Sequence, residues 1–226
     1  MGVYVYIDGF NFYYGLFKNK RRYHQLPAHY KWLDLLKLSQ AIAPDTTIAW
    51  IGYFTAYVKQ VPRDPDQHLR QRAYIEALRT LTNLEVIPGN FQPTTKWGVP
   101  HQSISTQPMK FDTFEEKGSD VNLAVRLVWD AAQDAFSEAV VISNDSDLRE
   151  AVRIVTQEAR KPVRVVSPDV SVNNALKAVA TRAAPLDVRL FKRCLFAETL
   201  TNSDGVIISR PSAWSPRAQP PKRQHR

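Results

Sequence analysis

Four aspartates have the positions and the chemistry expected of a metal site. Asp8 ends a short apolar run near the N-terminus, Asp145 and Asp147 follow a second apolar run, and Asp120 lies where a helix is expected to begin. Carboxylates gathered in one concavity raise each other's pKa unless a cation lies among them. Oxygen ligands without His or Cys favour Mg²⁺ or Mn²⁺. Such ions can deliver hydroxide to a phosphodiester and stabilise the leaving oxygen, so the pattern predicts a metal-dependent phosphodiester hydrolase.

Each of these carboxylates also has an ordinary structural explanation. Asp8 with Gly9 can form an Asx turn at the end of a strand. Asp120 in the first turn of a helix complements the helix dipole. Capping explains one of Asp145 and Asp147, but it does not require both. The metal hypothesis therefore depends on a fold that brings these acids together.

The elements that must position the acids alternate along the chain. Short apolar runs predict strands, and apolar residues at helical spacing predict helices between them. The expected strands are residues 3–7, 47–58, 84–87, 139–143 and 163–166, and the expected helices are residues 12–38 with an irregular middle, 66–81, 119–132, 148–155 and 172–179. This order predicts an α/β fold with a mainly parallel sheet, whose strands present their carboxyl ends at one edge.

Three further segments have less regular patterns. Ser119 is expected to cap the helix that carries Asp120. Residues 89–112 are expected to form a long polar loop, and loops of this length in compact domains are often functional. The pattern of residues 190–200 does not decide the type of element that they form.

Composition excludes several classes of protein. The 226 residues are enough for one domain with a real core and a tail. No apolar stretch approaches the roughly 20 residues of a membrane span, and no signal peptide is visible, so we expect a cytoplasmic protein. The single Cys194 and five scattered histidines provide neither a disulfide nor a zinc motif. Walker-type, dinucleotide-binding and nucleophile-elbow motifs are absent.

The net charge of +8 is concentrated at the C-terminus. Residues 209–226 contain five basic residues, four prolines and no acid. We therefore expect a nuclease domain over residues 1–200 and a basic, Pro-rich, disordered tail over residues 201–226. Such a tail suits a polyanion, although a merely solubilising role fits its composition equally well.

Basic and aromatic residues are interleaved in two segments that could bind nucleic acid. Bases stack on aromatic rings, while Lys and Arg neutralise phosphates. The residues predicted to do this are Lys18, Lys20, Arg21, Arg22, Lys96 and Trp97. The rings of residues 12–38 could instead form the core side of a helix, with the basic residues at its solvated end.

Three blocks of the sequence resemble the signatures of NYN domains. They are Ile7-Asp8-Gly9-Phe10-Asn11-Phe12, Lys117-Gly118-Ser119-Asp120-Val121-Asn122-Leu123 and Ser143-Asn144-Asp145-Ser146-Asp147-Leu148. More narrowly, they are similar to the LabA-like bacterial branch of the PIN-like nuclease superfamily. The resemblance covers roughly residues 3–195. It implies a Rossmann-like, three-layer α/β/α sandwich with metal-dependent RNase chemistry.

The resemblance also implies roles for individual residues. The implied metal-site and catalytic residues are Asp8, Asp120, Asp145 and Asp147, supported by Asn11, Asn144 and Lys117, of which Lys117 is expected to contact phosphate. Two positions depart from the family pattern. Asn144 stands where glycine is usual, and Ser119 stands where small apolar residues are usual. Because Asn tolerates unusual backbone angles, we expect the turn at Asn144 to survive.

The sequence thus predicts a Mg²⁺- or Mn²⁺-dependent endoribonuclease that acts on single-stranded or loop RNA. RNA is favoured over DNA as the partner, no membrane is expected, and a homo-oligomer or a protein partner stays open. Two alternatives remain. One is a non-catalytic regulator that binds RNA or protein with the same fold. The other is a DNA or flap nuclease, since the same carboxylate chemistry serves either polymer.

Overall fold

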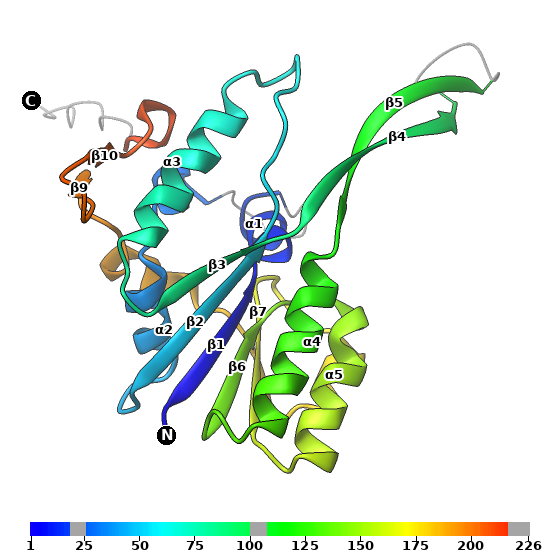
Figure 1. The fold of residues 1–226 in the computed structure, drawn as a ribbon, viewed down its shortest axis with the longest axis vertical. Helices are drawn as coiled ribbons and strands as arrows, with labels where there is room; N and C mark the ends of the chain where they lie inside the picture. The colour runs from blue at the N-terminus through cyan, green and yellow to red at the C-terminus, as the bar shows by residue number, and fades with distance from the viewer. Residues whose placement is uncertain (19–25, 100–107, 217–226) are drawn as a thin grey trace, which may run out of the picture.

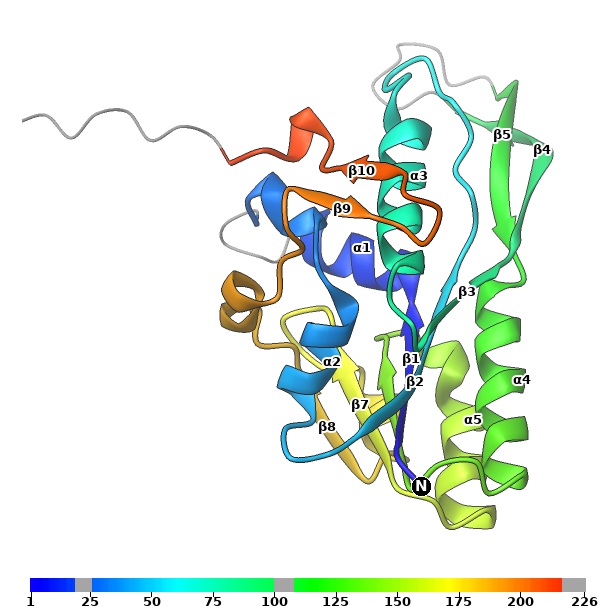
Figure 2. The same ribbon diagram turned by 60° about the vertical axis from the view of Figure 1, so that its left-hand side comes forward.

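A six-stranded parallel sheet forms the centre of the molecule. The computed structural model describes residues 1–18, 26–99 and 108–216. The strands of the sheet are β1 (Val3–Asp8), β2 (Ile48–Thr55), β3 (Leu84–Pro88), β6 (Glu138–Ile142), β7 (Val163–Ser167) and β8 (Arg182–Pro185). They lie in the order β3-β2-β1-β6-β7-β8, and every neighbouring pair is parallel (Figures 1 and 2).

Helices cover both faces of this sheet. One face packs against α1 (Gly9–Phe17), α2 (Leu35–Ile42), α3 (Gln67–Arg79) and the 3₁₀ segment η4 (Val188–Arg193). The other face packs against α4 (Ser119–Ala132), α5 (Arg149–Arg153), the π-helical segment η3 (Ile154–Glu158) and α6 (Asn174–Lys177). The alternation of side chains along β1 explains the two cores, since Val5 and Ile7 face the first layer and Tyr6 faces the second. The predicted α/β/α sandwich with a parallel sheet is confirmed.

The sequence predicts a long loop at residues 89–112, but its described parts belong to an antiparallel ribbon, and residues 100–107 lie outside the described residues. Strand β4 (Asn90–Gly98) pairs with β5 (Met109–Lys117) along its whole length. Both figures show the ribbon extending away from the sheet (Figures 1 and 2). The loop prediction was wrong because the ribbon buries no complete face: Trp97 is 70% exposed and Phe111 is 46% exposed. Without a buried face, alternation of apolar and polar residues gives no strand signal.

The base of the ribbon is tightly packed against the start of α4. A Cβ atom at Gly89 would lie 2.7 Å from Glu116 Oε1 and 3.0 Å from the backbone nitrogen of Ser119, so glycine is needed for this close approach. The predicted cap by Ser119 is wrong. Gly118, with φ of 93°, occupies the N-cap position, and the Ser119 N–H donates to Glu116 Oε1 at 3.0 Å.

The N-terminal aromatic segment is helical at both ends and irregular in the described part of its middle, as the sequence predicts. Helix α1 ends at Phe17, and the 3₁₀ turn η1 (Ala28–Lys31) precedes α2. Trp32 is fully buried, and its indole N–H donates to the carbonyl of Ala197 at 2.7 Å. Phe12 and Phe17 are also buried, whereas Tyr14 is 54% exposed, so the core role that the sequence left open applies to part of these rings.

Residues beyond 200 are part of the folded domain. They form β9 (Thr199–Thr201), β10 (Ile207–Ser209) and the 3₁₀ turn η5 (Ser212–Trp214). The Trp214 ring is buried, with its centroid 6.4 Å from that of Trp32 and 6.3 Å from that of Tyr74. The expected start of the tail at residue 201 therefore does not mark the end of the packed chain, and residues 217–226 lie outside the described residues. None of the described helices has the length and apolar character of a membrane span.

Candidate metal centre

The acidic residues lie where the sheet changes direction. From β1 the chain continues to β2 and β3 on one side, whereas β6, β7 and β8 extend on the other side. Parallel sheets of this kind bind ligands beyond the carboxyl ends of the two strands that flank such a switch point. Asp8 is the last residue of β1, and Asp145 lies just after β6. The topology alone therefore brings these two residues to one crevice.

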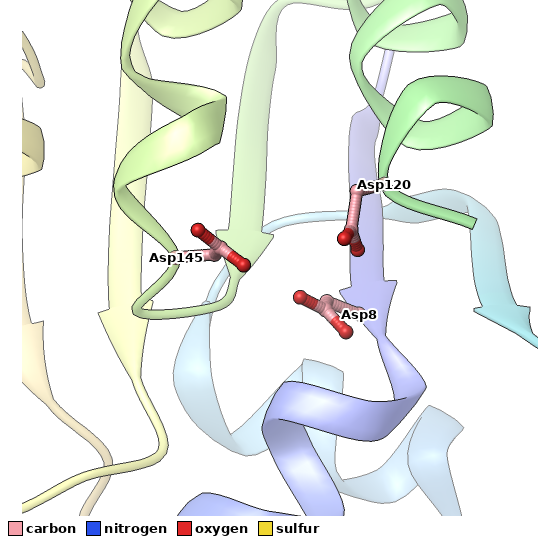
Figure 3. Close-up of side chains that lie close together, drawn as sticks. All are labelled: Asp8, Asp120 and Asp145. Atoms are coloured by element: carbon pink, nitrogen blue, oxygen red, sulfur yellow. The ribbon is translucent and has the colours of Figure 1, made fainter. Parts of the chain in front are cut away.

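Three of the four predicted carboxylates come together there. One carboxylate oxygen from each of Asp8, Asp120 and Asp145 lies within 4.8 Å of the others. Figure 3 shows the three side chains pointing toward a common centre from β1, from the first turn of α4 and from the loop after β6. Asp8 is buried, whereas Asp120 and Asp145 are partly exposed. The group is therefore anchored at its base and accessible on its outer side.

Hydrogen bonds fix the Asp8 carboxylate. Oδ1 accepts the backbone N–H of Asn11 at 2.9 Å, and Oδ2 accepts the hydroxyl of Ser143 at 2.9 Å. The same Ser143 oxygen accepts the backbone N–H of Asp145 at 3.1 Å. Ser143 is fully buried, so it links Asp8 and Asp145 without contact with solvent.

No cationic side chain of the described residues pairs with the acids of this group. Burial raises the pKa of Asp8 to about 7, against the opposing hydrogen bond from Asn11, and the charge of Asp120 adds to the increase. Burial also raises the pKa of Asp120, together with the charges of Asp145, Glu116 and Asp147. Within residues 1–18, 26–99 and 108–216, no salt bridge reaches Asp8, Asp120 or Asp145. An all-oxygen donor set with unbalanced negative charge fits a hard divalent cation.

A chain of asparagine contacts positions the loop after β6. The Asn144 N–H donates to Asn11 Oδ1 at 2.8 Å, and Asn144 Oδ1 accepts the N–H of Asn173 at 2.6 Å. Asn144 is not among the non-glycine residues of the described chain that have positive φ. The departure from the family's glycine therefore adds a side-chain bridge to the next loop, and no unusual backbone angle is involved.

Two of the other predicted residues lie outside the group of three. Asp147 is exposed, and its backbone N–H donates to Asp145 Oδ1 at 3.0 Å. Lys117 is exposed and forms a salt bridge with Glu115 at 3.0 Å. A role for Asp147 in the outer shell of a metal and a contact of Lys117 with phosphate stay predictions.

The residues predicted to bind nucleic acid lie in two separate places. Lys18 is exposed at the C-terminal end of α1. Lys96 and Trp97 lie on β4, where Lys96 forms an ion pair with Glu115 and Trp97 projects into solvent. Lys20, Arg21 and Arg22 lie outside the described residues. Of the predicted residues that the structure describes, Lys18 therefore lies near the sheet, and Lys96 and Trp97 lie next to each other in sequence on the ribbon.

Sequence reasoning missed two residues that shape the site. Ser143 has no distinctive local signal beyond its position between the strand and Asp145, because its contact with Asp8 spans two strands. Glu116 binds the first N–H of α4 and contributes negative charge beside Asp120. Glu116 lies three residues before the start of the helix, and an acidic residue close to an expected helix start is a sequence signal for a side chain that interacts with the helix N-terminus.

Comparison with known proteins gives a family and a fold. The NYN domain family model matches residues 2–187. The chain is 32% identical over 193 residues to 6-hydroxy-3-succinoylpyridine 3-monooxygenase from Pseudomonas putida, an alignment that covers 73% of this chain and 58% of that enzyme. It thus spans little more than half the length of this relative.

A solved structure has a similar fold. The crystal structure of a protein of unknown function from Vibrio parahaemolyticus superimposes with a TM-score of 0.51 at 16% identity. The match covers 82% of this chain and 93% of that protein. At this identity the likeness concerns the fold alone.

Proposed function

The chain belongs to the NYN domain family, and from this premise we propose that it is a divalent-metal-dependent nuclease of the PIN-like superfamily. Within that superfamily we place it in the LabA-like branch, as an endoribonuclease of the cytoplasm that cuts single-stranded or loop RNA. The observation that carries the proposal is the group of Asp8, Asp120 and Asp145, whose carboxylate oxygens lie within 4.8 Å of one another.

Each acid has a distinct part in this proposal. Asp8, Asp120 and Asp145 would hold Mg²⁺ or Mn²⁺, and the bound ion would supply an activated water and stabilise the leaving oxygen. Asp8, fixed from both sides by Asn11 and Ser143, sets the position of the site. Asp147, exposed beside Asp145, is placed to accept a proton from an incoming water or to orient it.

The substrate strand would be held by residues away from the acids. Trp97 offers a stacking surface, and Lys96 and Lys18 offer positive charge. The lysines would bind backbone phosphates and the ring would stack on any base, so these contacts would supply affinity without sequence preference. The basic residues of the C-terminal segment would add to this affinity. Recognition of RNA over DNA requires contact with the 2′-hydroxyl.

Hydroxylation of an aromatic acid is the second candidate function. It is favoured by the 32% identity with a 6-hydroxy-3-succinoylpyridine 3-monooxygenase, which extends over 73% of this chain. A monooxygenase needs dioxygen and a source of electrons, which is chemistry that cofactors supply. The described part of this chain contains no dinucleotide-binding glycine turn, and the relative has a further segment that this chain does not match. We therefore place the nuclease first.

The test is cleavage of matched, end-labelled single-stranded RNA and DNA by the wild type and by Asp120→Asn. Each is assayed with Mg²⁺, with Mn²⁺ and with EDTA. We expect RNA cutting that requires metal and disappears in the variant, which also controls for contaminating nucleases. Cutting of DNA alone would establish the DNA nuclease. RNA binding without cutting would favour the regulator. Oxygen consumption with the pyridine substrate and a reductant would favour the second candidate.

A further inference from the structure

An aromatic pocket adjoins the metal centre on the face of the sheet covered by α1. It lies among α1, η1, the end of β2, α3 and η5, and has a volume of about 150 Å³. Its wall contains the rings of Tyr13, Tyr30, Tyr53, Tyr74 and Trp214. Pockets that bind small molecules are typically lined by apolar and aromatic side chains with a few polar groups at fixed positions.

One cation in this wall, Lys31, forms no ion pair with an acid of the described residues. Lys31 Nζ donates to the Tyr13 hydroxyl at 3.3 Å and lies 5.2 Å from the centroid of the Tyr13 ring and 5.5 Å from that of Phe17. Within the described chain Lys31 forms no salt bridge. Burial lowers the pKa of Lys31, as does the nearby charge of Arg70, whereas the charge of Asp64 raises it. A half-buried ammonium whose direct contacts in the described chain are a phenol and two ring faces has unused capacity to bind an anion.

The remaining charges of the pocket leave it positive. Arg70 and Lys18 also line it, and Asp64 is its one carboxylate among the described residues. Asp64 accepts a hydrogen bond from Arg70 at 2.5 Å, so that pair is satisfied internally. Lys31 and Lys18 are left to attract negative charge. The pocket thus combines flat apolar walls with positive charge, which is complementary to an aromatic ring that carries an acidic group.

The pocket and the acidic group share a wall. Gly9 lines the pocket and directly follows Asp8. A Cβ at Gly9 would lie 2.8 Å from the carbonyl oxygen of Phe54 and 2.9 Å from Cζ of Tyr53, so α1 begins in close contact with β2. Burial raises the pKa of Tyr53, and the Asp8 charge contributes. The wall of the pocket therefore includes the residue that directly follows Asp8.

We propose that this pocket binds a small planar aromatic molecule with an acidic group, with the ring among the tyrosines and the anion on Lys31. Such binding goes beyond the proposed nuclease, because it requires neither metal nor cleavage. Two sources share this chemistry. One is a nucleotide, whose base would enter the pocket and whose phosphate would meet Lys31. The other is a free aromatic carboxylate. The experiment therefore compares the two.

The test is isothermal titration calorimetry of the full chain in EDTA. The ligands are uridine and adenosine 5′-monophosphate, 4-hydroxybenzoate, and the uncharged comparators uridine, adenosine and 4-hydroxybenzamide. We expect one-to-one binding of at least one anion and about tenfold weaker binding of its uncharged counterpart, since a hydrogen bond to a charged group contributes about this much. Preference for the monophosphates would identify a nucleotide site, and preference for 4-hydroxybenzoate would identify a site for free aromatic acids.

Variants link the binding to the pocket. Lys31→Met, which keeps the length of the side chain, should reduce the affinity for the anion to that for the uncharged comparator. Lys177→Met, an exposed lysine on α6 outside the pocket, should bind like the wild type. The proposal fails if the wild type binds none of the anions with saturation, or if it binds each acid no more tightly than its uncharged counterpart. Both of these outcomes are measured on the wild type, so they do not depend on whether a variant folds. If the protein binds one of the anions but cuts no RNA, the proposed nuclease activity is refuted and the proposed ligand pocket is supported.

Discussion

The hydroxyl of Ser143 donates to Asp8 Oδ2 at 2.9 Å, across the boundary between two neighbouring strands. Because the same oxygen accepts the Asp145 N–H at 3.1 Å, a single buried side chain links the carboxylate of Asp8 to the backbone of Asp145. Residues that orient metal ligands in this way commonly change metal affinity or activity about 10–100-fold when they are replaced.

Replacement of Ser143 should therefore impair the centre without removing a ligand. We expect Ser143→Ala to weaken Mn²⁺ binding about tenfold, measured by calorimetry, and to slow RNA cleavage to a similar degree. Ser137→Ala is the matched control, since that hydroxyl bonds to Gly2 at the opposite end of the sheet. Equal Mn²⁺ affinity in the wild type and in Ser143→Ala would show that Ser143 does not position the acids.

The stability of the metal-free protein should fall as the pH rises. The pKa of Asp8 is about 7 in the fold, against 3.8 as its ordinary value, so the folded state holds the proton more tightly. This contribution is fully present below about pH 4 and is lost as the pH rises through 7. The difference corresponds to roughly 4 kcal/mol.

Melting curves in EDTA between pH 5 and pH 8 test this expectation. The melting temperature of the wild type should fall over this range, and that of Asp8→Asn should change less, because an amide does not titrate. Saturating Mn²⁺ should stabilise the wild type more at pH 8 than at pH 6, since the metal displaces a proton. Parallel curves for the two proteins would contradict the raised pKa.

Asp120 and Asp147 should differ in their effect on metal binding. Asp120 belongs to the group within 4.8 Å, whereas Asp147 is exposed and outside it. We expect Asp120→Asn to abolish measurable Mn²⁺ binding and Asp147→Asn to leave it within about threefold of the wild type, a small change in free energy, while both slow RNA cleavage. A larger loss of metal affinity in Asp147→Asn than in Asp120→Asn would mean that Asp147, and not Asp120, binds the metal directly.

The exposed ring of Trp97 should contribute to RNA affinity. Stacking of a base on an aromatic side chain contributes about 1–3 kcal/mol, so Trp97→Ala should weaken binding of single-stranded RNA by a measurable factor in the Asp120→Asn background, where no cutting interferes. Trp129→Ala is the control, because Trp129 is similarly exposed at 61%, against 70% for Trp97, but lies on α4. Filter binding at two salt concentrations would show the loss. The same affinity in both variants would remove the ribbon from the proposed RNA surface.

Much of the central layer could be predicted from the sequence because its signals are local. The apolar runs that end at Asp8 and before Asp145 are buried parallel strands, which show continuous hydrophobicity when both faces are covered. The parallel sheet and the resemblance of the three blocks together predicted the proximity of Asp8, Asp120 and Asp145, which the structure shows. Their role as metal ligands stays a prediction.

Features that depend on distant partners could not be predicted. The ribbon is held by backbone pairing between β4 and β5, which leaves no local pattern of apolar residues in the sequence. The Ser143 contact joins residues 135 positions apart in the chain. Trp214 lies in a segment whose composition predicted disorder, yet its ring fills a gap beside Trp32 and Tyr74. In each case a tertiary contact outweighed the local pattern.

The close packing at Gly89 joins the ribbon to the first turn of α4, which carries Asp120. Nine residues per strand give an arm about 30 Å long at the usual rise of a strand. Its base continues through Gly118 into Ser119 and Asp120, while Gly89 leaves no free space against Glu116 and Ser119. One short stretch of chain, from Glu116 to Asp120, therefore belongs at once to the base of the ribbon and to the start of the helix that carries an acid of the group.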